Sequence, residues 1–290
     1  MKDQSIQELI DLYNSGKLDI VEKKIVELIK KKPKSFVLYN LFGTILVDKK
    51  NFNQALVNYK KSLEINPNYA EGHNNLGVAF YKLRKFNESI DSYQRAIKIK
   101  PNFSKAHNNL GLAYKELEKF TESINNYQKA IKINPGYAEA YNNLGVTFKQ
   151  LGELNESFNN YQKAIKINPE YAEAYNNLGN VYNSNQKIDD AILNYKKAIK
   201  LNANFPEAYS NLGNLLKEIG EVEEAEKYEN KLLSLRPNDI EYKINVILSI
   251  SPIVSSIEEI NYCRNKYEKG LDLLKEYQYL SEKPGDTIKT

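Results

Sequence analysis

Apolar residues recur along most of the chain at the spacing of amphipathic α-helices. Within residues 104–137, His107, Leu110 and Gly111 mark one i, i+3, i+4 stripe, and Ile124 and Tyr127 begin a second stripe after a polar stretch. This spacing is typical of helices that bury one face against a neighbour. The pattern therefore predicts pairs of short helices joined by turns. No apolar run approaches the ~20 residues that a membrane-spanning helix needs.

The helix-pair pattern repeats every 34 residues. The segment AEAYNNLG occurs at residues 138–145 and again, unchanged, at residues 172–179. A fixed period of this size indicates a solenoid, in which each unit buries its apolar surface against its neighbours. In-phase units cover residues 36–69, 70–103, 104–137, 138–171, 172–205 and 206–239, after a degenerate copy at residues 2–35. We predict a repeat domain over residues 1–239, a C-terminal helical cap over residues 240–280 and a linker-like tail over residues 281–290.

Residue size at fixed positions of the unit predicts how its two helices meet. Position 8 is Gly in six units, positions 20 and 27 are mostly Ala or Ser, and position 24 is Tyr in five units. Small residues let two helices approach closely, and large residues fill the space opposite them. The glycines are Gly43, Gly77, Gly111, Gly145, Gly179 and Gly213, and the tyrosines are Tyr59, Tyr93, Tyr127, Tyr161 and Tyr195. Position 32 is Pro in most units, where it ends the second helix.

This combination of residues resembles the tetratricopeptide repeat. The resembling pattern is Tyr-x-x-Leu-Gly-x-x-Tyr/Phe, as at Tyr141, Leu144 and Gly145, followed by Ala or Ser, Tyr, Ala and Pro at fixed spacings. The resemblance implies an all-α fold, a right-handed α-solenoid (superhelix) of about seven helix pairs whose first helices line a concave groove. We expect C-terminal capping helices after the last pair. The degenerate first repeat, residues 2–35, departs from the pattern, with Leu9 in place of Gly, as a terminal capping repeat does.

Two adjacent asparagines recur on the predicted first helices, at positions 5 and 6. We call them the asparagine ladder: position 6 is Asn75, Asn109, Asn143, Asn177 and Asn211, and position 5 is Asn40, Asn74, Asn108, Asn142 and Asn176. Asn is roughly 0.6 kcal/mol worse than Ala in a helix. One amide can accept from and donate to a peptide backbone at once. We therefore predict that Asn74, Asn75 and their equivalents from Asn108 to Asn211 bind an extended polypeptide; alternatively, duplication has merely copied solvated asparagines.

Position 2 of the unit is mostly acidic, with Glu71, Glu139, Glu173 and Glu207 on four of the predicted first helices. Such a row favours basic or polar ligands if it lines the groove. The other reading is an ordinary solvated helix face.

Several kinds of activity have no support in the sequence. The two histidines, His73 and His107, stand where other units place Tyr, which favours packing over catalysis. The single Cys263 excludes a disulfide framework or a multi-cysteine metal site, and we expect it to be a buried thiol. No nucleotide-binding loop, HExxH or GxSxG motif occurs, so we predict no enzyme activity, metal or cofactor in this chain.

Charge and composition limit which partners and which cellular compartment we expect. The net charge is +4, with 41 basic and 37 acidic residues mixed along the chain rather than gathered in a basic stripe. We therefore expect no nucleic-acid binding. The polar, acidic start does not resemble a signal peptide, so we expect a cytoplasmic protein that does not bind membranes.

The segment after residue 239 leaves the 34-residue phase. Residues 240–250 read as one more amphipathic helix, and Ser256 and Glu259 form a candidate capping box for a helix that runs to about residue 280. The stripe expected to pack on one side of that helix is Ile257, Ile260, Tyr267, Leu271 and Leu274.

The repeats and this tail also resemble the repeat arm of protein O-linked N-acetylglucosamine transferases and SPINDLY-like proteins. In that family position-6 asparagines line the groove and hold the acceptor polypeptide, which would place Asn75, Asn109, Asn143, Asn177 and Asn211 in that role. The sugar-nucleotide-binding α/β domains of that family have no counterpart in these residues.

Three functions follow as hypotheses. The leading one is a scaffold that binds an extended polypeptide in an asparagine-lined groove. The second is the substrate-binding arm of a glycosyltransferase whose catalytic domain is not in this chain. The third is assembly of larger complexes, with self-association through the convex face or an uncapped end.

Overall fold

The computed structural model describes residues 4–236 and the helical residues 257, 260, 261, 264, 265, 267–269, 271, 272 and 275. Every regular element within residues 4–236 is an α-helix, which confirms the all-α prediction for this part of the chain. The chain divides into two compact units, residues 1–167 (unit 1) and residues 168–290 (unit 2), and each is taken by itself below. Outside the described residues lie the predicted helix of residues 240–250, the capping box, Cys263, Leu274 of the predicted stripe and the tail of residues 281–290.

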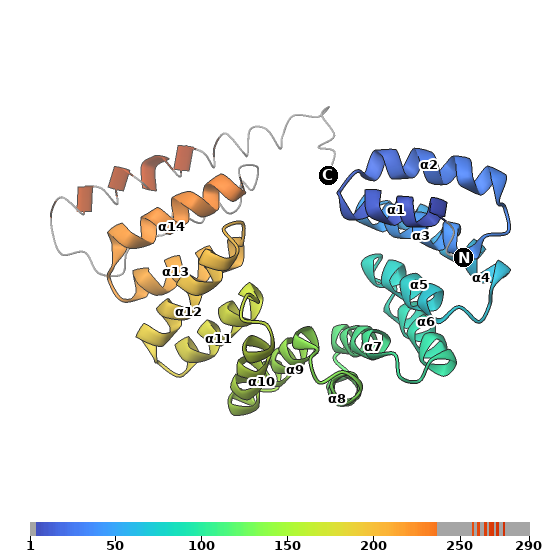
Figure 1. Ribbon diagram of the computed structural model, residues 1–290. Helices are drawn as coiled ribbons and strands as arrows, with labels where there is room; N and C mark the ends of the chain where they lie inside the picture. The colour runs from blue at the N-terminus through green and yellow to red at the C-terminus, as the bar shows by residue number, and fades with distance from the viewer. Residues whose placement is uncertain are drawn as a thin grey trace. The chain divides into compact units, whose positions relative to one another are not determined.

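Helix pairs follow one another along both units (Figure 1). Unit 1 contains α1 (Gln4–Asn14), α2 (Leu18–Lys31), α3 (Phe36–Asp48), α4 (Phe52–Ile65), α5 (Ala70–Lys82), α6 (Phe86–Ile99), α7 (Ser104–Glu116), α8 (Phe120–Ile133), α9 (Ala138–Gln150) and α10 (Leu154–Ile167). Unit 2 contains α11 (Ala172–Ser184), α12 (Ile188–Leu201), α13 (Pro206–Glu218) and α14 (Val222–Leu235).

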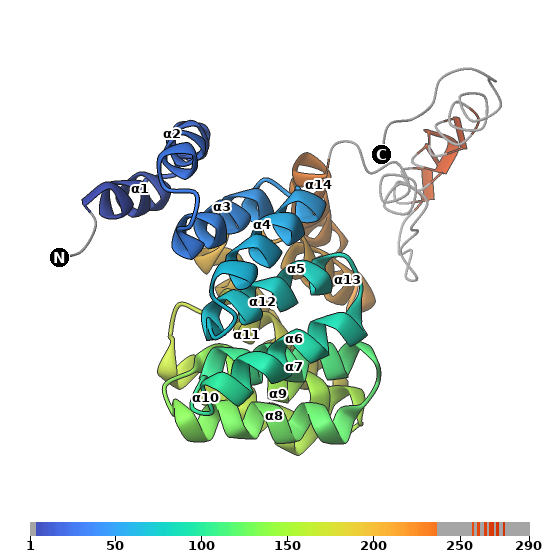
Figure 2. The same ribbon diagram turned by 90° about the vertical axis from the view of Figure 1, so that its right-hand side faces the viewer.

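The order of helix contacts explains how unit 1 curves. Each first helix packs on its own second helix, and that second helix packs on the next first helix. The first helices α3, α5, α7 and α9 also contact one another in turn, whereas the described second helices α4, α6 and α8 share no comparable contact. Unit 1 therefore bends with its first helices on the inside, as Figure 1 shows; Figure 2 shows the same helices from the side. We call the exposed face of α3, α5, α7 and α9 the inner surface.

The seam between the two helices of a repeat is a tyrosine ring on a glycine. The position-24 tyrosines Tyr59, Tyr93, Tyr127, Tyr161 and Tyr195 are at most 2% exposed. A Cβ atom added at Gly77 lies 2.5 Å from Cε1 of Tyr93, closer than carbon atoms pack. The alanines at positions 20 and 27, such as Ala191 and Ala198, are fully buried.

The last described repeat departs from this seam. Glu229 of α14 takes the tyrosine position, is 4% exposed, and forms an ion pair with Lys217 of α13. Gly213 of this repeat therefore faces a flexible side chain, and an added Cβ lies 3.4 Å from Cγ of Glu229.

The turn inside each repeat needs a left-handed backbone at position 15. Gly152 and Gly220 have φ angles of 78° and 87°, which glycine adopts without a steric penalty. Four repeats place a larger residue in the same conformation: Lys50, Arg84, Glu118 and Gln186, with φ angles of 56° to 59°.

The tyrosine seam predicts that the protein unfolds in alkali. Burial raises the pKa of Tyr161 to about 12 and also raises the pKa of Tyr59, Tyr93, Tyr127 and Tyr195. An unfolded tyrosine ionises near pH 10, so the folded state holds these protons more tightly. Stability should be complete below about pH 10 and should fall as the pH rises above it.

This prediction is checked by following tyrosinate absorbance and helical circular dichroism together as the pH is raised. Loss of helix should accompany ionisation of the last tyrosines. Complete ionisation near pH 10 with the helices intact would contradict the buried seam.

The C-terminal stripe differs from its prediction where it can be compared. Ile257, Ile260, Tyr267 and Leu271 are helical but 73%, 55%, 42% and 37% exposed. Periodicity placed these residues on one helix face, but periodicity alone does not supply a neighbour for that face to pack against.

Candidate binding surface

The asparagine ladder connects successive first helices by side-chain hydrogen bonds. In unit 1, Nδ2 of Asn109 on α7 donates to Oδ1 of Asn74 on α5 at 2.9 Å, and Nδ2 of Asn143 on α9 donates to Oδ1 of Asn108 at 3.0 Å. The same bond joins Asn75 to Asn40 at 3.1 Å, and in unit 2 it joins Asn211 to Asn176 at 2.9 Å. In these four pairs the position-6 amide donates to the position-5 amide of the preceding repeat.

The position-5 asparagines are buried in this contact between repeats. Asn74 is 2% exposed and Asn108 is fully buried, and Asn40, Asn142 and Asn176 are at most 9% exposed. Two of them also use an N–H group, since Nδ2 of Asn74 donates to Oδ1 of Asn75 at 3.3 Å and Nδ2 of Asn108 donates to Oε1 of Glu139 at 3.2 Å. A bound polypeptide therefore has little access to the position-5 side chains.

The position-6 asparagines are more accessible. Asn75, Asn143, Asn177 and Asn211 are half-buried, while Asn109 is 9% exposed. A primary amide has two N–H groups and an oxygen with two lone pairs. The bond to the preceding repeat uses one N–H of Asn143, so its second N–H and its oxygen retain hydrogen-bonding capacity toward the inner surface.

The acidic residues at position 2 are partly paired within their own repeats. Oε1 of Glu71 accepts from Nζ of Lys100 at 2.8 Å, and Oε1 of Glu207 accepts from Nη2 of Arg236 at 2.9 Å. The hydrogen bond from Lys100 lowers the pKa of Glu71. These pairs reduce the net negative charge that the acidic row presents to a ligand.

Lysines lie near the C-terminal ends of two first helices of unit 1, whereas the acidic residues of position 2 lie near the N-terminal ends. Lys115 of α7 and Lys149 of α9 both occupy position 12 and are half-buried. Burial lowers the pKa of Lys149. Both lie near helix C-termini, where a cation favours the helix dipole.

The described residues contain no cluster of three or more His, Cys, Asp or Glu side chains that could hold a metal ion. The histidines are packed between helices as predicted: His73 and His107 are each 7% exposed, and their Nε2–H groups donate to the carbonyl oxygens of Pro67 at 2.9 Å and Pro101 at 3.1 Å. Among the described helices, none is both long and apolar enough to span a bilayer.

Fold and surface together define a class of protein: a solenoid of helix pairs whose first helices, within unit 1, contact one another in turn along one face. Comparison with known protein families identifies this class more specifically. The family described as TPR repeat matches residues 43–84, 113–152, 147–186 and 179–220, and families described as Tetratricopeptide repeat match residues 70–103, 92–125 and 206–239. The chain belongs to the tetratricopeptide repeat family.

Solved structures share this fold at low sequence identity. A chain of the APC/C hetero-tetramer Cut9–Hcn1 superposes with a TM-score of 0.70 and 18% identity over 81% of this chain and 46% of that one. PilF of Pseudomonas aeruginosa gives a TM-score of 0.62 and 20% identity over 73% of this chain and 97% of its own. TTC0263 of Thermus thermophilus gives 0.53 and 23% over 61% and 96%.

A search of curated proteins gives no match. This chain spans less than half of the Cut9–Hcn1 chain, and identities of this size establish the fold alone. The family and the fold make the chain a scaffold suited to protein–protein interaction, since tetratricopeptide repeats generally act without catalysis.

Proposed function

We propose that this protein binds an extended segment of a partner polypeptide along its inner surface, and that the position-6 asparagines contact the backbone of that segment. The observation that carries the proposal is the recurrence of a half-buried position-6 amide in the same orientation, at Asn75 on α5 and Asn143 on α9 of unit 1. Asn75 and Asn143 are fixed by hydrogen bonds of 3.1 Å and 3.0 Å, and each retains one N–H. The oxygen of Asn143 also retains its hydrogen-bonding capacity, and the oxygen of Asn75, which accepts from Asn74, keeps one lone pair.

The spacing of these amides suits an extended chain. Packed helices lie roughly 8–10 Å apart, so successive position-6 amides are separated by about that distance. An extended chain advances roughly 3.3 Å per residue. One amide therefore falls at every third residue or so of a segment that runs across the first helices.

The position-5 asparagines have a supporting role in this proposal. The nearly inaccessible side chains of Asn74 and Asn108 hold the amides of Asn109 and Asn143 by hydrogen bonds of 2.9 Å and 3.0 Å. Fixing an amide before binding lowers the entropy that binding must overcome.

The test replaces Asn75, Asn109 and Asn143 together with Ala and measures peptide affinity by fluorescence anisotropy. The probes are unstructured peptides about ten residues long with unrelated sequences, each made also with N-methylated backbone amides. At about 1 kcal/mol per hydrogen bond, the triple variant should bind at least tenfold more weakly, and N-methylation should weaken binding to the unmodified protein.

The matched control is Asn125→Ala on the exposed face of α8. It should leave the affinity unchanged. If the triple variant keeps its helicity and its affinity, the position-6 amides do not bind the peptide.

The second function, the substrate-binding arm of a protein O-linked N-acetylglucosamine transferase-like enzyme, is supported by the ladder sequence itself, which includes two identical copies of AEAYNNLG. The family and structure matches above concern the repeats alone. The coding sequence beyond Thr290 decides this point: a following sugar-nucleotide-binding α/β domain supports it, and a stop codon opposes it.

A further inference from the structure

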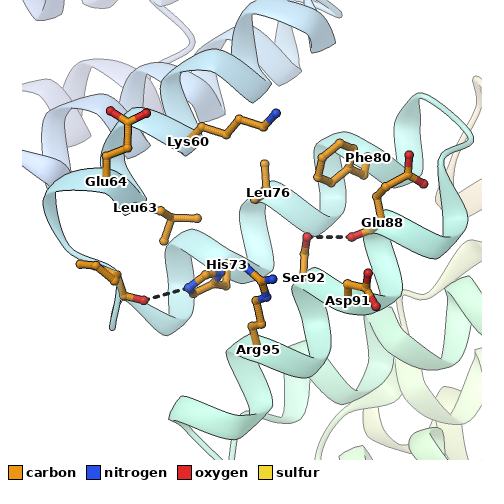
Figure 3. A pocket seen from close by; sticks show the side chains of 11 residues that line it. Lys60, Leu63, Glu64, His73, Leu76, Phe80, Glu88, Asp91, Ser92 and Arg95 are labelled. Carbon is orange, nitrogen blue, oxygen red and sulfur yellow. Dashed lines mark hydrogen bonds between the residues drawn. The ribbon is translucent and has the colours of Figure 1, made fainter.

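A cavity of about 520 Å³ opens between α4 and α6 of unit 1, with α5 as its floor (Figure 3). None of its lining residues belongs to the asparagine ladder, so it is separate from the surface proposed above. The lining residues are Lys60, Leu63, Glu64, Pro67, His73, Leu76, Phe80, Glu88, Asp91, Ser92 and Arg95.

In two later repeats, the position equivalent to His73 carries a tyrosine that lies beneath a cation. In unit 1, Nζ of Lys163 lies 5.9 Å from the ring centre of Tyr141, and in unit 2 Nζ of Lys197 lies 5.9 Å from the ring centre of Tyr175. The tyrosines stand at position 4 of the repeat and the lysines at position 26. A cation at this distance from an aromatic face is attracted by the ring quadrupole.

The repeat of residues 70–103 keeps the cation but lacks the tyrosine. Position 26 is Arg95, position 4 is His73, and both side chains line the cavity. Arg95 forms no ion pair within the described part of the chain. The smaller imidazole also cannot move into the space, because its Nε2–H donates to the carbonyl oxygen of Pro67 at 2.9 Å.

The next repeat shows the same association of a histidine with an open cavity. His107 at position 4 and Lys129 at position 26 line a cavity of about 670 Å³. This second cavity has a more basic wall, because Lys129 and Lys132 line it and none of its described lining residues is acidic. The His73 cavity offers more apolar contact, since Leu63, Leu76 and Phe80 form its floor and one wall.

We infer that the His73 cavity is a docking pocket for an aromatic side chain, phenylalanine or tyrosine, of a partner polypeptide. The incoming ring takes the place of the tyrosine that other repeats supply, packs on Leu63 and Leu76, and lies beneath the guanidinium of Arg95. Lys60 marks the opposite rim, with its Nζ 6.0 Å from the ring centre of Phe80.

The charges at the rim narrow the class of ligand further. Glu64, Glu88 and Asp91 line the cavity beside the two cations, so a ligand carboxylate would meet like charges. Ser92 already uses its hydroxyl to donate to the carbonyl oxygen of Glu88 at 2.8 Å, as Figure 3 shows. These groups favour a neutral ring over an anionic ligand.

The experiment titrates the full chain with N-acetylphenylalaninamide and N-acetylleucinamide and follows backbone amide signals by NMR. The phenylalanine probe should shift signals of α4, α5 and α6 in a saturable way, with a dissociation constant in the millimolar range. The leucine probe should bind at least threefold more weakly. Absence of saturable shifts with the phenylalanine probe, or equal shifts with both probes, would overturn the proposal.

Two variants make the result specific to this cavity. His73→Tyr restores the tyrosine of the other repeats and should abolish binding, and Arg95→Gln removes the cation and should weaken it about threefold. The matched control Lys163→Gln alters a cation that already covers Tyr141 and should change nothing. Binding that persists in folded His73→Tyr, or that is unaffected by Arg95→Gln, would place the ring elsewhere; Arg95→Gln decides the matter if His73→Tyr does not fold.

Discussion

Replacing Gly77 with Ala should destabilise the protein by about 2 kcal/mol, although Ala is the better helix former. The new Cβ lies 2.5 Å from Cε1 and 2.7 Å from Cδ1 of Tyr93. The Tyr93 ring is 2% exposed and packed on all sides, so it has no open space to move into. Overpacking of this kind costs roughly 1–3 kcal/mol, which exceeds the gain of up to about 1 kcal/mol in helix propensity.

Urea unfolding followed by circular dichroism measures this loss as a lower midpoint. In a solenoid each repeat contacts only its neighbours, so hydrogen exchange should accelerate most in α5 and α6.

The chain supplies its own control at Gly213. There an added Cβ lies 3.4 Å from Cγ of Glu229, an ordinary contact with a flexible side chain. Gly213→Ala should therefore be neutral or slightly stabilising. Equal destabilisation by both substitutions would show that the tyrosine contact does not explain the glycine.

Replacing Asn74 with Ala should destabilise unit 1 by about 1–2 kcal/mol. The substitution removes the acceptor of Nδ2 of Asn109, which lies 2.9 Å away on a side chain only 9% exposed. A buried donor without a partner costs roughly 1–3 kcal/mol. The better helix propensity of Ala returns only about 0.6 kcal/mol.

Asn125→Ala is the matched comparison, because Asn125 is exposed on α8 and its replacement should be neutral or stabilising by a few tenths of a kcal/mol. A double-mutant cycle of Asn74 and Asn109 should give a coupling energy of about 1 kcal/mol. Additive effects in that cycle would show that the two amides do not support each other.

The helix pairs and the seam were predictable because the relevant signals are local and are repeated. The glycine of position 8 and the tyrosine of position 24 lie 16 residues apart in the sequence, and the close contact depends on the tyrosine: where Glu229 replaces it, the close contact at Gly213 is lost. Repetition of one size pattern in successive units removes most alternative packings. The helices accordingly begin at Phe36, Ala70, Ser104, Ala138, Ala172 and Pro206.

The direction in which the ladder amides point was not predictable, because it depends on contacts between repeats. Adjacent residues of a helix differ by about 100° in direction, so positions 5 and 6 cannot face the same environment. Asn108 is fully buried between helices, whereas Asn143 is half-buried. Helix spacing alone gives no signal for which of two identical neighbours is covered by the next repeat.

Two further features could not be predicted from the sequence, for similar reasons. The left-handed turn is visible in the sequence only at Gly152 and Gly220, because Lys50 and Arg84 adopt it at an energetic cost that repeat packing compensates. The exchange of Tyr for His73 was visible, but the cavity beside it depends on where Arg95 and Phe80 lie.

The ladder also gives the array of repeats a polarity with two defined ends. A central repeat offers an acceptor amide to the repeat that follows and a donor amide to the repeat before it. Residues 36–69 have the acceptor Asn40 but Leu41 beside it, and residues 206–239 have the donor Asn211 but Ser210 beside it. Gene duplication or deletion of a central repeat leaves matching neighbours, whereas copying either end would insert a mismatch, so an array of this kind lengthens and shortens only from within.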